Sequence, residues 1–226
     1  MPPRAPRASR ASRASRPSRP SRTSRPPRPP RPSRPSRPTP SSSAPAPSSP
    51  LSTTGPIFFW KPHEVPYGIF SQWYTAAFSA PNPDGTTTTF NTAEQYMMYQ
   101  KAILFNDTAI AEEILETSDP RTQKALGRAV KDFDEATWCA RRSEIVEEGN
   151  YWKFKNDPSV LLASGERELV EASPRDRVWG VGFGAVRAPM TRQRWGLNLL
   201  GKALMETRRR IREEKEGGGD VGESVV

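Results

Sequence analysis

The chain has 226 residues and a formal net charge of +9, but this charge is unevenly distributed. Residues 1–55 hold 12 of the 34 basic residues, all of them arginine, and no acid, whereas the remainder carries 22 basic and 25 acidic residues. The high isoelectric point therefore belongs to the N-terminal segment and does not by itself make the protein a nucleic-acid binder. The single Cys and single His exclude an intrachain disulfide and a zinc site built from His and Cys alone.

Residues 1–55 are expected to be a disordered Arg/Ser/Pro-rich extension and linker. Arg recurs at every third position from Arg4 to Arg37, without Leu, Ile, Val, Phe, Trp or Tyr between, so these residues cannot build a core. A polyproline II conformation, with three residues per turn, would place the arginines in one stripe. Three interpretations stay open: contact of residues 4–37 with nucleic acid or another acidic partner, an organelle transit peptide, or a solvated low-complexity extension. The prolines count against the transit peptide.

Residues 56–212 are expected to form one domain, because all the Trp, Phe and Tyr residues follow position 55. No apolar run of about 18 residues occurs, so we expect no membrane contact. A lone cysteine suits a reducing compartment, which favours an intracellular location, cytoplasmic or nuclear, over an organelle. Residues 213–226 are polar and are expected to be a disordered tail.

In chain order, strands are predicted at 57–60, within the aromatic stretch 67–80, and after an Asp84-Gly85 turn up to Phe90. Helices are predicted at 92–105, 107–118 and 120–129, at 134–154 entered at Asp134, from an Asp157 N-cap, and from Trp195 onward. A short strand at 167–173 and a glycine-rich loop at 179–184 separate the last two helices. Mostly helices with a few short strands indicate an α+β domain without a βαβ series.

The helix at 92–105 carries two opposite charges on one otherwise apolar face, at Glu94 and Lys101. One interpretation is structural: Asn91 and Glu94 would form a pair like a capping box, and Lys101 would extend its ammonium to solvent. The other is functional, because a buried carboxylate and ammonium are costly and such groups are kept at functional sites. The near absence of His and Cys makes carboxylates, with a Lys, the leading acid/base groups.

The segment 169–184 combines Glu171, Asp176 and Trp179 with glycines at 180, 182 and 184. It is not a dinucleotide-binding fingerprint, because no helix begins directly after the glycines. Its structural interpretation is a tight turn. Its functional interpretation is a site where a Trp face stacks on a base and backbone N–H groups hold an anion.

Five motifs together resemble the NADAR domain, also called the YbiA-like family, from about Phe58 to Arg212. They are "GIFSQWY" (68–74), "NTAEQYMMYQKAILFND" (91–107), "WKFKND" (152–157), "LVEASPRDRVWGVG" (169–182) and "GLNLLGKALMETR" (196–208). The resemblance implies a mainly helical YbiA-like fold and a metal-independent N-glycosidase without a cofactor. The substrates it implies are reactive riboflavin-pathway intermediates or ADP-ribosylated guanine of nucleic acid.

Matching motif to motif, the resemblance assigns catalysis to Glu94, Asp176 and Lys101. Lys101 would keep Glu94 ionised or bind phosphate, and which carboxylate is acid or base stays open. Substrate contacts are expected from Trp179, Phe70, Tyr74, Gly180, Gly182 and Asn198. The first motif departs from the family's usual F-L-S-N-F-Y, since Gln72 replaces Asn and Trp73 replaces Phe, which leaves the substrate choice open. The alternatives to an N-glycosidase are a non-catalytic module that binds ADP-ribose or nucleotides, tethered by the basic tail, and a purely structural helical domain.

Overall fold

The structure, a computed structural model, describes residues 54–217. The predictions for residues 1–53 and 218–226, including a nucleic-acid contact through residues 4–37, lie outside the described residues. The helices are α1 (Ala93–Leu104), α2 (Thr108–Glu116), α3 (Pro120–Ala129), α4 (Glu135–Lys155), α5 (Ser159–Ala163) and α6 (Leu199–Gly217). Two short 3-10 helices, η1 (Tyr67–Phe70) and η2 (Pro189–Arg194), complete the helical elements of this part of the chain.

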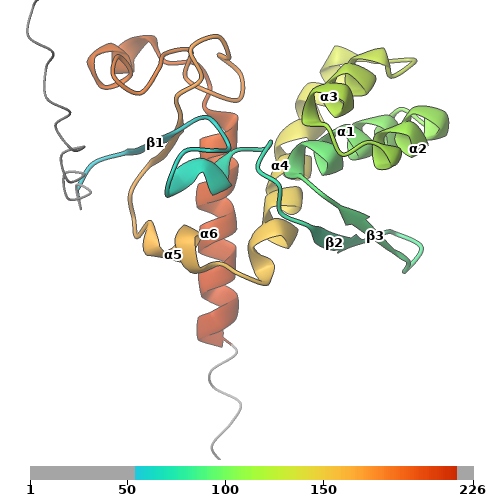
Figure 1. Cartoon of the computed structure of the whole chain (residues 1–226), viewed down its shortest axis with the longest axis horizontal. Helices are drawn as coiled ribbons and strands as arrows, with labels where there is room; N and C mark the ends of the chain where they lie inside the picture. The colour runs from blue at the N-terminus through green and yellow to red at the C-terminus, as the bar shows by residue number, and fades with distance from the viewer. Residues whose placement is uncertain (1–53, 218–226) are drawn as a thin grey trace, which may run out of the picture. The chain divides into compact units, whose positions relative to one another are not determined.

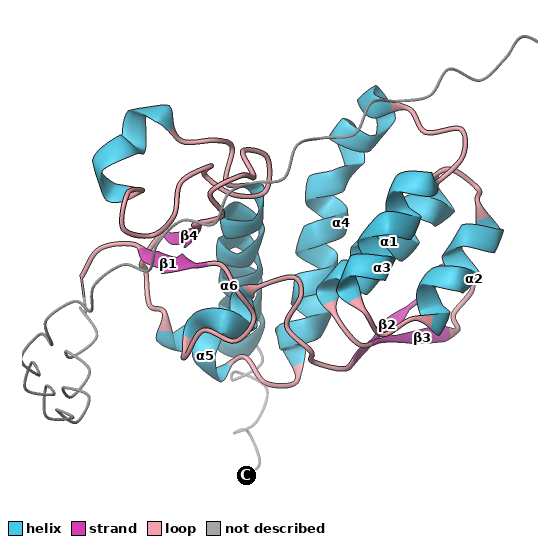
Figure 2. Cartoon of the chain, turned by 45° about the horizontal axis from the view of Figure 1, so that its top comes forward, coloured by secondary structure: helices cyan, strands magenta, loops and turns pink. Residues whose placement is uncertain are grey.

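Four short strands form two separate two-stranded sheets. β1 (Ile57–Phe59) pairs in parallel with β4 (Leu169–Glu171), so that Phe59 lies opposite Glu171. β2 (Phe78–Pro81) and β3 (Thr87–Phe90) form an antiparallel hairpin around the predicted Asp84-Gly85 turn. Figure 2 shows both pairs beside the helices. The prediction of a mainly helical α+β domain with a few short strands is confirmed.

The long helix α4 occupies the middle of the domain. It packs against α6 on one side and α1 on the other, and α1 in turn packs against α2 and α3; both views show this order (Figures 1 and 2). Gly149 of α4 permits the close approach of α1, because a Cβ there would lie 2.5 Å from the Tyr96 ring. On the other side of α4, α6 also packs against the strand β4.

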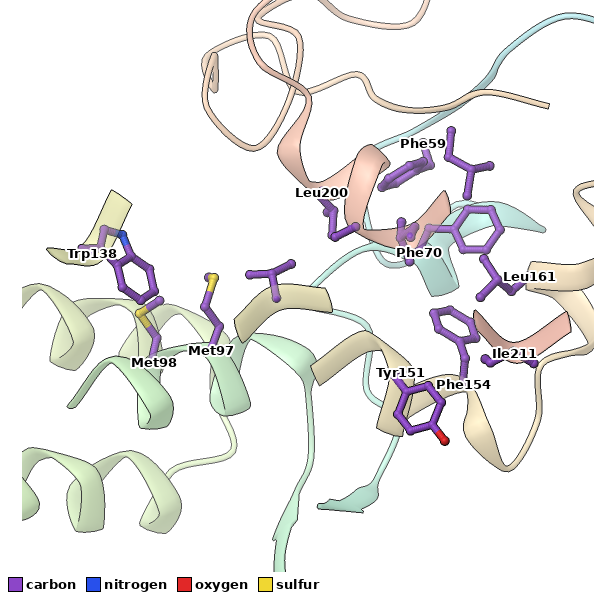
Figure 3. Close-up of a cluster of buried hydrophobic side chains, with 14 of the residues drawn as sticks. Phe59, Phe70, Met97, Met98, Trp138, Tyr151, Phe154, Leu161, Leu200 and Ile211 are labelled. Carbon is purple, nitrogen blue, oxygen red and sulfur yellow. The ribbon is translucent and has the colours of Figure 1, made fainter. Parts of the chain in front are cut away.

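The core runs through the domain as a continuous cluster of buried side chains (Figure 3). At one end the rings of Phe59 and Phe154 lie 5.5 and 6.1 Å from the ring of Phe70. At the other end, Figure 3 shows Met97 and Met98 beside Trp138. Burial of such side chains from water is the main source of the domain's stability.

The aromatic stretch 67–80 differs from the prediction, because only its end is a strand and its beginning is the 3-10 helix η1. The carbonyls of Ile69 and Ser71 both accept hydrogen bonds from Lys153 Nζ, at 2.6 and 3.0 Å. These carbonyls therefore bond to a side chain from α4 instead of to a neighbouring strand. An aromatic-rich composition is typical of strands, but here a distant lysine decides the conformation.

The predicted helix from Trp195 also begins later, at Leu199. Asn198 adopts a left-handed conformation with φ of 50°, which interrupts a right-handed helix. η2, which was not predicted, precedes this break. At the other end α6 continues to Gly217, one residue beyond the helix end expected from "RWGLNLLGKALMETRRRIREEKE" and five beyond the expected domain end at Arg212. The predicted N-cap Asp157 is wrong by one residue, because α5 begins at Ser159 with Pro158 at the N-cap position, although Asp157 Oδ1 still accepts a hydrogen bond from Ser159 N. In residues 54–217, no helix combines the length and apolar character that crossing a membrane requires.

Candidate active site

A pocket of about 770 Å³ lies between α1, α3, the start of α4 and the end of β4. The loop after β1, with Trp60 and His63, the segment after η1, with Gln72 and Trp73, and the loop after β4 also line it. The volume is ordinary for a small-molecule site. Its chemistry depends on three carboxyl groups, which come from parts of the chain far apart in sequence: Glu94, Glu171 and Asp176.

Glu94 lies in the first turn of α1 but does not cap it. The N-cap is Thr92, whose Oγ1 accepts a hydrogen bond from Gln95 N at 3.0 Å, and Gln95 Oε1 accepts one from Asn91 N at 2.8 Å. The interpretation of Asn91 and Glu94 as a capping pair is therefore wrong. Because its neighbours supply the cap, the Glu94 side chain turns inward and is only 3% exposed.

Burial raises the pKa of Glu94 to about 7. The positive charges of Lys124 and Arg128 and a hydrogen bond from the Trp73 side chain act against this rise, while the charge of Asp176 adds to it. Glu94 Oε1 has no hydrogen-bond partner in the described part of the chain. A buried carboxyl oxygen without a partner is costly, and such groups are typical of functional sites.

Glu171 ends β4 and is held there by its backbone. Its N–H donates to Asn198 Oδ1 at 3.0 Å, and its carbonyl accepts from Val181 N at 3.0 Å. Burial of the carboxyl, then the negative charges of Asp176 and Glu94, raise its pKa to about 8, against the opposing charge of Lys124. Its Oε2 is also buried and has no partner among residues 54–217. The sequence places Glu171 in one motif with Asp176 and Trp179, but its burial in the pocket comes from the fold and is not predicted.

Asp176 has a partly structural role. Its Oδ1 accepts hydrogen bonds from Val178 N and Trp179 N, both at 2.8 Å, and so fixes the turn that brings Trp179 to the pocket. Gly180 lets this turn fold back on β4, since a Cβ there would lie 2.7 Å from the carbonyl oxygen of Glu171. Asp176 thus contributes a negative charge that acts on both glutamates.

α3 presents a row of cations to the pocket, at Arg121, Lys124 and Arg128. The spacing i, i+3, i+7 places them on one helical face. Gly127 brings this face close to α1, because a Cβ there would lie 2.0 Å from Met98 Sδ. Sequence reasoning missed the row, although its helical spacing is visible in "PRTQKALGR" once α3 is recognised.

The NADAR domain model matches residues 58–212, which is most of the chain. The chain belongs to the NADAR domain family. It is 40% identical over 153 residues to N-glycosidase R617 of Acanthamoeba polyphaga mimivirus, covering 66% of this chain and 88% of that protein. It is 30% identical over 181 residues to the chloroplastic riboflavin biosynthesis protein PYRR of Zea mays, covering 76% of this chain and 27% of that protein. The NMR structure of the Escherichia coli protein YbiA superimposes with a TM-score of 0.57 at 28% identity, covering 72% of this chain and 88% of that one.

In this NADAR domain, Lys101 lines the pocket but has partners other than Glu94. Its Nζ donates to the carbonyl of Gly127 at 2.7 Å and lies 4.1 Å from the ring centre of Phe133 and 5.6 Å from that of Trp138. Burial lowers its pKa. The cations whose charges act on Glu94 are instead those of α3. Lys101 therefore joins α1 to the end of α3 at the wall of the pocket.

The other predicted residues of the NADAR motifs divide into two groups. Trp179 lines the pocket together with Glu94, Lys101 and Asp176. The remaining five, Phe70, Tyr74, Gly180, Gly182 and Asn198, are outside the pocket lining.

Each of these five has a structural environment that accounts for it. Phe70 is fully buried in the core, the ring of Tyr74 lies 5.7 Å from Lys153 Nζ, and Gly182 has a φ of 79° that favours glycine. Asn198 Nδ2 donates to the carbonyl of Leu169 while its Oδ1 accepts from Glu171, so it ties β4 to the start of α6. Residues 54–217 contain no group of three or more His, Cys, Asp and Glu side chains arranged to hold a metal ion.

Proposed function

We propose that this NADAR domain is an N-glycosidase that hydrolyses a ribosyl C–N bond. The observation that carries the proposal is the pair of buried carboxyl groups, Glu94 and Glu171, whose pKa values are raised to about 7 and about 8 in one pocket. Two carboxyl groups with different proton affinities are the minimum equipment for acid/base hydrolysis of a glycosidic bond. The name of the mimivirus relative, an N-glycosidase, supports the same reaction.

Glu171 is the general acid of this proposal. With a pKa of about 8 it is mostly protonated at pH 7, so it can give its proton to the departing nitrogen of the base as the C–N bond breaks. Departure of the base leaves positive charge on the anomeric carbon and ring oxygen of the ribose. The negative charges of Asp176 and Glu94 stabilise that cation.

Glu94 is the general base. Lys124, Arg128 and Trp73 favour its charged form, whereas Lys124 is the cation that favours that of Glu171, and with the lower pKa Glu94 is the carboxyl that ionises first. It accepts a proton from the water whose oxygen bonds to the anomeric carbon. The products are the free sugar and the base with its N–H restored, and the protons on Glu94 and Glu171 return to their starting positions through solvent.

The proposed substrate class rests on two kinds of side chain that line the pocket, cations and aromatic rings. The cations of α3 suit a phosphate group, since Lys124 and the two arginines have no ion-pair partner among the salt bridges of residues 54–217. Trp179, Trp60 and Trp138 supply aromatic faces for a base. A riboflavin-pathway intermediate and ADP-ribosylated guanine both combine a phosphate, a ribose and a base, so both belong in the assay.

The deciding experiment is hydrolysis of both substrate classes by the wild-type chain and by Glu94→Gln. We expect release of free sugar from one class, and a loss of roughly 10²–10⁴-fold in Glu94→Gln, the usual contribution of a general base. Glu112→Gln, on the exposed face of α2, is the matched control and should keep full activity. Binding without release by the wild type would favour the non-catalytic module, and full activity of Glu94→Gln would remove Glu94 from the mechanism.

Contact of residues 4–37 with nucleic acid is a separate proposal, which rests only on the regular arginine spacing. Counterion release makes phosphate binding strongly salt-dependent. We expect the affinity of the full chain for an unmodified oligonucleotide to fall steeply with salt, and to be lost when the arginines of residues 4–37 are replaced by glutamine. An unchanged affinity in that variant would contradict the proposal.

A further inference from the structure

Unpartnered buried polar atoms concentrate at the pocket. Residues 54–217 contain five buried side-chain nitrogen or oxygen atoms without a hydrogen-bond partner, and three belong to pocket-lining residues: Gln72 Nε2, Glu94 Oε1 and Glu171 Oε2. A fourth, Asn150 Oδ1, belongs to the residue that bonds to Gln72. Buried polar groups are normally satisfied, so an amide nitrogen and two carboxyl oxygens left without partners in one pocket indicate that a ligand completes them.

The orientation of the Gln72 amide is fixed by its neighbours. Asn150 Nδ2 donates to the carbonyl of Val146 at 2.8 Å and to Gln72 Oε1 at 3.0 Å. A carbonyl can only accept, so the nitrogen of Asn150 must face Val146. The same nitrogen also donates to Gln72, so the amide oxygen of Gln72 must face it. The N–H groups of Gln72 Nε2 are then left without an acceptor.

Gln72 is also held next to Glu94. The backbone carbonyl of Gln72 accepts a hydrogen bond from Glu94 N at 3.0 Å. Lys153 holds the same segment in place by donating to the carbonyls of Ile69 and Ser71. The Gln72 side chain is 7% exposed and lines the pocket. The Gln72 amide is therefore a buried donor, held by Asn150, in a residue whose backbone is bonded to that of Glu94.

We propose that Gln72 Nε2 donates a hydrogen bond to the ribose hydroxyl adjacent to the anomeric carbon, the 2-hydroxyl. A hydroxyl both accepts and donates, so it can accept from Gln72 and donate to a carboxylate oxygen such as Glu94 Oε1. The hydroxyl nearest the reacting carbon is the one that lies nearest the reacting carboxyl groups, and its hydrogen bonds strengthen in glycoside hydrolysis. The inference rests on the proposed function for the identity of the sugar. Its test measures binding and does not depend on turnover.

The test is calorimetric titration of the full chain with ribose 5-phosphate and with 2-deoxyribose 5-phosphate. We expect the wild type to bind the ribose compound about ten-fold more tightly, the size of one hydrogen bond to a neutral group. Gln72→Met keeps the length of the side chain without the donor, and should bind both sugars equally, at the affinity that the wild type has for the deoxy sugar. Gln193→Met, on the exposed helix η2 and away from this pocket, should keep the ten-fold ratio.

The ratio between the two sugars protects the test from a partly unfolded variant, because the folded fraction cancels. If Gln72→Met does not fold, Gln72→Asn retains the amide but retracts it by one methylene, and the ratio should shrink. An equal loss of affinity for both sugars, no preference in the wild type, or no binding of ribose 5-phosphate would each overturn the inference. A preserved preference without hydrolysis of any N-riboside would instead overturn the proposed function alone.

Discussion

At the residue scale, surroundings rather than residue type distinguish the three pocket carboxyl groups. Glu94 and Glu171 are both buried, and burial is the main reason that both pKa values rise. Asp176 differs because Oδ1 accepts two backbone hydrogen bonds, which make it part of a turn. The two glutamates differ in their neighbours: Glu94 has two cations and an indole that favour its charged form, and Glu171 has one cation.

Glu171→Gln should remove the alkaline limb of the pH–rate profile. In the wild type we expect the rate to fall as pH rises through about 8, because a carboxyl group whose pKa is raised to that value then loses the proton it must donate. The variant should be slower by roughly 10²–10⁴-fold and lack that fall. Rates at pH 6 to 9 check this. An unchanged limb would assign the general acid to another group.

Asp176→Asn should shift both pKa values down, because it removes a negative charge that raises them while keeping the Oδ1 acceptor of the turn. The alkaline limb of the rate should then move to lower pH. The matched control is Asp84→Asn, in the exposed turn between β2 and β3, which should leave the pH–rate profile unchanged. An unchanged pH–rate profile in Asp176→Asn would show that the charge of Asp176 does not affect the pKa values of the reacting groups.

At the element scale, the helix starts were predictable because their signals are local. Pro120 is the first residue of α3 and Asp134 caps α4, as the sequence indicated. The strand predicted within 67–80 does not form at its beginning, because Lys153, far away in sequence, donates hydrogen bonds to the carbonyls of Ile69 and Ser71. The same distinction applies to the site: Glu94 was visible as a charge on an apolar helix face, whereas the cations of α3 became site residues only through the packing of α3 against α1.

Gly127→Val should test that packing. A Cβ at Gly127 would lie 2.0 Å from Met98 Sδ, so the variant should lose about 1–3 kcal/mol of the free energy of unfolding, as overpacked cores do. It should also raise the KM for a phosphorylated substrate, because α3 carries Lys124 and Arg128. Ala125→Val, on the exposed side of the same helix, makes the matched change, and should cost less than about 1 kcal/mol from helix propensity. Equal losses in the two variants, from denaturant unfolding, would contradict the role of the close approach.

At the scale of the whole domain, three buried ionisable groups have pKa values that are shifted in opposite directions and fall near neutral pH. Burial raises the pKa of Glu94 to about 7 and of Glu171 to about 8, and lowers the pKa of Lys153 to about 7. Between about pH 4.5 and 8 the folded state binds more protons on the two glutamates than the unfolded chain does, so stability falls as pH rises. Between about pH 7 and 10.5 the unfolded chain binds more protons on Lys153, so stability rises with pH.

The domain should therefore be least stable around pH 7 to 8, as measured by the midpoint of thermal unfolding across pH 5 to 10. Glu171→Gln should flatten the fall on the acid side, and Lys153→Met should flatten the rise on the alkaline side. The Lys153 variant should also lose activity, because Lys153 fastens the segment that carries Gln72 and Trp73. A stability maximum at neutral pH would show that the three groups do not dominate this pH range.

The pairing of β1 with β4 has a consequence for how the domain is made. Ile57 leaves the ribosome early, but its partner Leu169 and the carboxyl of Glu171 emerge only after α1 to α5 have been synthesised. Until then the backbone groups of β1 have no strand to bond, and Phe59 has no complete core to enter. Contacts between distant parts of a chain form late and slowly. We expect nascent chains that end before Leu169 to bind chaperones, and protection of β1 from proteolysis to appear only once β4 is available.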